Sequence, residues 1–129
     1  MGQVLNFFPL TIFKSRIDLT KEKKLEMIEE ILAMEKKSKN IDYKNESSAW
    51  TGDTQGFEYI HNNPIFDDFF IAVKKAIIEY LNVLEIDHDQ LDIFIQRSWA
   101  TISREKENIA LHKHLQSHLS FSLEIVAQD

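Results

Sequence analysis

The spacing of the apolar residues changes near residue 91, and this change constrains the fold more than any other feature of the chain. Before it, apolar side chains recur three and four residues apart, as in amphipathic helices. After it, residues 91–102 are rich in β-branched and aromatic side chains, which favour strands. Helices and strands in separate blocks are typical of an α+β fold with helices on one face of a sheet.

Two helices are expected before residue 91. The first has its N-cap within Asp18-Leu19-Thr20 and runs for about 17 residues to the basic segment 36–40, whose lysines suit the negative end of a helix dipole. Its apolar stripe comprises Leu25, Ile28, Ile31 and Leu32, with Met27 and Met34 beside it. The second helix begins at Asn63-Pro64, an N-cap followed by proline in the first turn. Its buried stripe comprises Phe66, Phe69, Phe70, Val73, Ile77, Tyr80 and Leu81.

The remaining apolar segments predict strands. Strand is expected over residues 4–14, 91–102, 109–114 and 119–126. Pro9 favours an edge position with a kink for the first of them. The long strand places one set of alternating side chains on a common face: Ile93, Ile95, Arg97 and Trp99. Residues 40–56 are polar and predict a loop, and residues 104–108 predict a charged turn.

Composition indicates a single domain over residues 1–129, with 43% hydrophobic and 28% charged residues. The formal net charge of -6 argues against nucleic acid as a partner, because phosphate binding needs a basic surface. The absence of cysteine excludes disulfides and thiolate metal sites. We expect a cytoplasmic protein without a membrane partner, since the sequence shows neither a signal peptide nor an apolar run of about 20 residues.

His112 and His114 are the strongest candidates for chemistry. In a strand, side chains two positions apart share a face at roughly 7 Å, so two imidazoles can converge on one metal ion. From the spacing alone, however, a pair of surface or hydrogen-bonded strand histidines is favoured over a metal site. His118 lies roughly 20 Å from His112 along a strand and joins it only if the chain turns between them. His61 and His88 occur in polar contexts and are expected on the surface as ordinary histidines.

The order of several short motifs resembles the 2-oxoglutarate/Fe(II)-dependent oxygenases of the His-x-His-x-x-Ser-x-Leu-Ser type. The matching residues, in chain order, are Asn6, Phe8, Pro9, Ile12, Trp50, Gly52, Thr54, Ser98, Trp99, His112, His114, Ser117, Leu119 and Ser120. Their order agrees from end to end, so the resemblance covers essentially the whole chain.

The resemblance implies a fold in which the N-terminal strand and two helices pack on the first part of a double-stranded β-helix, or jelly-roll, core. It implies Fe(II) held by His112 and His114 within a facial set of three ligands, with 2-oxoglutarate as co-substrate. His114 stands where related oxygenases carry a carboxylate, so a ligand is kept and a negative charge is lost. Trp99, Ser117 and Ser120 are candidates for supporting the site. The implied function is hydroxylation of an unidentified small-molecule or protein substrate.

The resemblance ends after Ser120. Residues 121–124 replace the family's Gly-Val-Tyr-Tyr, Leu115 replaces a preferred proline, and the family's distal iron histidine and basic residue have no counterpart. We therefore expect an incomplete oxygenase domain, with residues 1–90 as its N-terminal part and 91–129 as the start of its β core, as from a truncated or frame-disrupted gene. Unpaired strand edges then predict self-association. The alternative functions are an inactive remnant, or a binding or assembly module that holds a divalent metal through the histidines.

Overall fold

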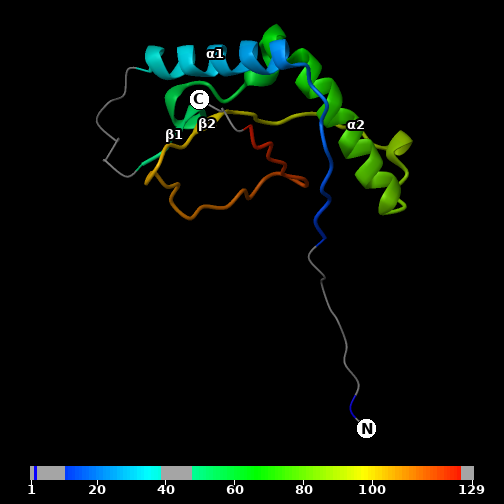
Figure 1. The fold of residues 1–129 in the computed structure, drawn as a ribbon. Coiled ribbons are helices and arrows are strands. Elements are labelled where there is room, and N and C mark those ends of the chain that lie inside the picture. Colours follow the sequence, from blue (N-terminus) through cyan, green and yellow to red (C-terminus); the bar gives the residue numbers. More distant parts are fainter. Residues whose placement is uncertain (1, 3–10, 39–47, 126–129) are drawn as a thin grey trace.

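A computed structural model describes residues 2, 11–38 and 48–125, which contain two helices and one small sheet (Figure 1). In chain order the elements are α1 (Lys21–Lys37), β1 (Trp50–Thr51), α2 (Asp67–Val83) and β2 (Thr101–Ile102). Short 3₁₀ turns lie at Gly52–Gln55, Ile60–Asn62, Pro64–Phe66 and His88–Gln90. In Figure 1, α1 runs across the top, α2 descends at one side, and the two strands lie beneath α1. Within the described part, no helix is long and apolar enough to cross a membrane.

The first predicted helix is confirmed as α1, which has 17 residues. Thr20 caps it, because its Oγ1 accepts a hydrogen bond from the backbone N–H of Lys23 at 3.2 Å. The predicted stripe is wrong in part: Met27 and Met34 are buried, at 3% and 5% exposure, while Leu25 and Leu32 are exposed. The two methionines stand seven residues apart on one helix face, and Leu25 lies about 200° around the helix from Met27.

The second predicted helix is also confirmed. The Asn63 side chain accepts a hydrogen bond from the backbone N–H of Ile65 at 3.1 Å, and Pro64 opens a 3₁₀ turn that leads into α2. The predicted stripe is buried or half-buried along its length: Phe66, Phe69, Phe70, Val73, Ile77, Tyr80 and Leu81. The predicted start is early by one turn, because Asn63 caps the 3₁₀ turn Pro64–Phe66 and α2 itself begins at Asp67.

The hydrophobic core lies between the two helices and the β1 region. Its buried members are Met27, Met34, Trp50, Ile60, Phe66, Phe69 and Val73. Trp50 joins the sheet to α1, because its indole Nε1–H donates to Ser38 Oγ at 3.0 Å while Ser38 donates to the carbonyl of Met34. Arg104 adds a second connection through paired 2.8 Å contacts with the carboxylate of Glu35.

The sheet is antiparallel and two residues long on each strand. Trp50 pairs with Ile102 and Thr51 pairs with Thr101. Isolated parallel bridges join Tyr59 to Ser98 and Ser48 to Asn108. The prediction of a loop over residues 40–56 is therefore wrong at Trp50–Thr51, whose pairing partner lies some 50 residues further along the chain. Such a distant partner leaves no local sequence signal.

Three predicted strands differ from the structure. Of residues 91–102, only Thr101–Ile102 form a strand, and the described residues of 109–114 and 119–126 form none. A strand exists only where a neighbour accepts its backbone hydrogen bonds, and here β1 offers a partner two residues long. The alternating side chains of residues 91–102 also do not share one buried face, because Arg97 is exposed and Ser98 is buried. The predicted strand 4–14 lies mostly outside the described residues, and residues 11–14 are irregular.

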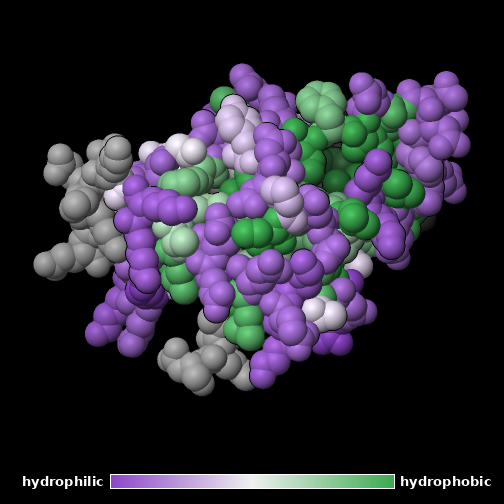
Figure 2. All heavy atoms as spheres, turned by 90° about the horizontal axis from the view of Figure 1, so that it is seen from above, coloured by the Kyte–Doolittle hydropathy of each residue, from purple (hydrophilic) through white to green (hydrophobic). Residues whose placement is uncertain are grey.

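The chain after β2 makes a wide excursion below the sheet and returns toward it (Figure 1). Many of its apolar side chains are exposed, and Leu111 is fully so. Seen from above, apolar surface is most extensive on the side where α2 lies, where Ile71 and Val83 are exposed (Figure 2). The jelly-roll core implied by the resemblance stays a prediction, since the described sheet has two short strands.

Candidate metal centre

His112 and His114 lie close together on the exposed chain that follows β2. Their ring centroids are 5.1 Å apart and the ring planes are inclined at 70°. The closeness expected from the two-residue spacing is present, although these residues form no strand. Two imidazoles this near each other can contribute nitrogen ligands to one divalent ion after modest rotation of the side chains.

The ring of His112 is oriented by the backbone. Its Nδ1 lies 2.9 Å from the carbonyl oxygen of Ala110. A carbonyl can only accept a hydrogen bond, so this contact requires a proton on Nδ1. In the neutral imidazole the proton then resides on Nδ1, and Nε2 keeps its lone pair. This arrangement is the one that commonly orients metal-ligating histidines in proteins.

The ring of Trp99 stacks on the ring of His114. The two ring centroids are 5.5 Å apart and the planes are nearly parallel, at 19°. The guanidinium carbon of Arg97 lies 5.4 Å from the centroid of the same indole. Successive contacts therefore run from the Arg97 guanidinium to the Trp99 ring, and from there to the rings of His114 and His112. Trp99 was a candidate for supporting the site, and its ring contacts His114.

Ser117 and Ser120 contact each other, with their hydroxyl oxygens 3.1 Å apart. Both are exposed, as is His118. Across residues 2, 11–38 and 48–125, no three side chains of histidine, cysteine, aspartate or glutamate group closely enough to hold a metal ion. Among the described residues, His112 and His114 therefore have no third side chain of these types close enough to join them at a metal ion.

The expectation that His61 is an ordinary surface histidine is wrong. Its side chain is half-buried, and its Nδ1 lies 2.6 Å from the hydroxyl oxygen of Ser98, which also accepts the His61 backbone N–H at 3.0 Å. The ring edge meets Tyr59 and Phe70 at centroid distances of 6.1 and 6.0 Å. No local pattern could have shown this contact, because 37 residues separate the two partners.

The contact between Ser98 and His61 helps to hold residues 58–61 against the segment that contains Ser98. The backbone N–H of Ser98 donates to Glu58, and its carbonyl accepts from Ile60, at 3.0 and 3.1 Å. Ser98 is only 7% exposed, so its hydroxyl group lies in the interior of the protein. His88, also expected on the surface, is half-buried with Nδ1 3.3 Å from a carboxylate oxygen of Asp89.

Comparisons of the chain with protein-family models, with curated proteins and with solved structures give no match.

Proposed function

We propose that this chain binds a divalent metal ion through His112 and His114, as the metal-holding segment of an Fe(II)/2-oxoglutarate-dependent dioxygenase that hydroxylates a small-molecule or protein substrate. The observation that carries the proposal is the 5.1 Å separation of the two rings, with the Nδ1 of His112 held by the Ala110 carbonyl. The oxygenase assignment is supported by the ordered motifs that end in this segment.

The roles of the chain's residues follow from their contacts. His112 presents Nε2 to the metal because its Nδ1 is held by a backbone carbonyl. His114 supplies the second nitrogen, and its stacking on Trp99 restricts the orientation of the ring. When bound together, iron and 2-oxoglutarate supply the activation of dioxygen, and the protein's part is to bind and orient them.

A titration with Fe(II) under anaerobic conditions, followed by calorimetry, tests the proposal. We expect binding that tightens about tenfold when 2-oxoglutarate is present, since two ligands of one centre couple within the usual range of such effects. His112→Ala is expected to abolish this binding. His88→Ala is the matched control, because it removes a histidine at a distant 3₁₀ turn and should leave the affinity unchanged. Equal effects of the two variants would contradict the proposal.

A second function, that of a non-catalytic metal-binding or assembly module, is favoured by one observation. Two exposed histidines without a third ligand among the described residues suit Zn(II) or Ni(II) as well as Fe(II). In this case metal binding still depends on His112, and 2-oxoglutarate does not change the affinity. An inactive remnant would instead show no metal binding that depends on His112.

A further inference from the structure

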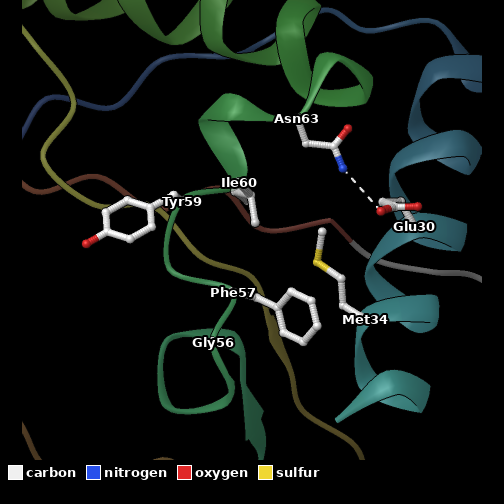
Figure 3. A pocket seen from close by; sticks show the side chains of 7 residues that line it. All are labelled: Glu30, Met34, Gly56, Phe57, Tyr59, Ile60 and Asn63. Atoms are coloured by element: carbon white, nitrogen blue, oxygen red, sulfur yellow. Dashed lines mark hydrogen bonds between the residues drawn. The ribbon is translucent and has the colours of Figure 1, made fainter.

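A partly open pocket of about 230 Å³ lies between α1 and the segment 56–63 (Figure 3). Three apolar side chains converge on it: Met34 from α1, and Phe57 and Ile60 from the segment that faces the helix. Glu30 and Asn63 meet beside them and are the charged and amide groups of the lining. The pocket shares no residue with the His112 and His114 pair.

The carboxylate of Glu30 is positioned at this pocket by Asn63. The amide Nδ2–H of Asn63 donates to Glu30 Oε1 at 3.1 Å, while its Oδ1 accepts from the backbone N–H of Ile65 at 3.1 Å. Both ends of the amide are therefore engaged, which defines its orientation. A carboxylate has about four acceptor sites on its two oxygens, so Glu30 keeps capacity for a further donor.

The size and the lining of the pocket limit what can fill it. An engineered apolar cavity of about 150 Å³ holds benzene, so about 230 Å³ admits a ring with a short chain. The flexible thioether of Met34 adapts to aromatic groups, and Phe57 offers a ring face or edge. Among the lining residues that the structure describes, Glu30 is the only charged one, and the chain's net charge of -6 favours the approach of cations.

We propose that this pocket binds a small organic ammonium ion. Its apolar body lies among Met34, Phe57 and Ile60, and its ammonium group donates a hydrogen bond to the free acceptor sites of Glu30. The site is independent of the metal function proposed above.

The test uses 2-phenylethylammonium as the probe and the uncharged 2-phenylethanol as its isostere. Each is titrated into the full chain, and the methyl resonance of Met34 is followed by NMR. We expect the ammonium ion to bind with a Kd on the order of 1 mM, as suits a ligand of this size, and the alcohol to bind several times more weakly.

Substitution of Glu30 by glutamine removes the negative charge of the pocket and keeps the shape of the side chain. Glu30→Gln is expected to weaken binding of the ammonium ion about three- to fivefold, the range for a partly exposed ion pair, and to leave alcohol binding unchanged. Glu29→Gln removes the same charge from an exposed neighbouring position of α1 that does not line the pocket, and should have no effect. His112→Ala should also leave ammonium binding unchanged.

Three results would overturn the proposal. They are equal affinity for the ammonium ion and the alcohol, equal effects of Glu30→Gln and Glu29→Gln, and no shift of the Met34 methyl at ligand concentrations well above the expected Kd. The comparison of the two ligands on the unaltered chain needs no variant to fold.

Discussion

Trp50→Phe should destabilise the protein substantially, because Trp50 joins the sheet to α1. The side chain is buried, and its Nε1–H donates to Ser38 Oγ at 3.0 Å. Loss of this hydrogen bond costs about 1 kcal/mol. Replacement of the indole by a phenyl ring removes about three buried ring atoms, which costs about 2 kcal/mol more. The total is about 3 kcal/mol.

For a chain of 129 residues, unfolding entropy near the melting point is about 0.27 kcal/mol per kelvin, so this loss lowers Tm by about 10 °C. Thermal unfolding followed by circular dichroism measures the change. Trp99→Phe is the matched control, because Trp99 is half-buried and lies in the irregular segment before β2. Its Tm should fall by only a few degrees. A Tm for Trp50→Phe within the error of the unaltered protein, or equal losses in the two variants, would refute the reasoning.

The remaining predictions concern the turn, the helix cap and the exposed chain. Gly52→Ala should lower the free energy of unfolding in denaturant by about 2 kcal/mol. The reason is that a Cβ there would lie 3.2 Å from the Trp50 ring and 3.3 Å from a backbone carbonyl. An unchanged free energy of unfolding would show that the turn can shift. Thr20→Ala should cost about 1 kcal/mol, because it removes the acceptor for the backbone N–H of Lys23, and an unchanged denaturation midpoint would rule out this cap. The isolated chain should self-associate through unpaired extended segments and exposed apolar residues such as Leu111, and a monodisperse monomer with sharp melting in light scattering and calorimetry would contradict this.

The helices could be predicted from the sequence because their signals are local. Thr20 and Asn63 are each followed within three residues by the N–H groups that they cap. The stripe from Phe66 onward repeats at helical spacing and is buried or half-buried along its length. The stripe of α1 was harder to assign, because Leu25 and Met27 are both apolar but point in opposite directions around the helix.

The strands could not be predicted in the same way. The β-branched segment 91–102 has strong β propensity, but propensity describes a side chain that fits a pleated surface and does not supply a pairing partner. Only Thr101–Ile102 form a strand, and they pair with Trp50–Thr51 in a segment whose polar composition predicted a loop. Ser98 adds a single isolated bridge to Tyr59. Pairing over such distances depends on the tertiary fold.

In the candidate site, too, local features could be predicted from the sequence and long-range contacts could not. The closeness of His112 and His114 follows from their two-residue spacing. A supporting role for Trp99 was expected only through the family resemblance, and its stacking on His114 was not expected. The contact between His61 and Ser98 joins residues 37 positions apart and had no signal at all. Local spacing therefore predicts that the two rings lie close together, whereas the residues that contact them are visible only in the structure.

The most direct test of the metal site is a titration of the ¹⁵N-labelled chain with Zn(II), a diamagnetic substitute for Fe(II), in which the histidine ring nitrogens are followed by NMR. The account predicts that Nε2 of His112 and one ring nitrogen of His114 shift together and saturate at one ion per chain. The Nδ1 of His112 should keep its proton, because it donates to the Ala110 carbonyl. Shifts at His61 or His88 in place of this pair, or no response of His112, would contradict the account.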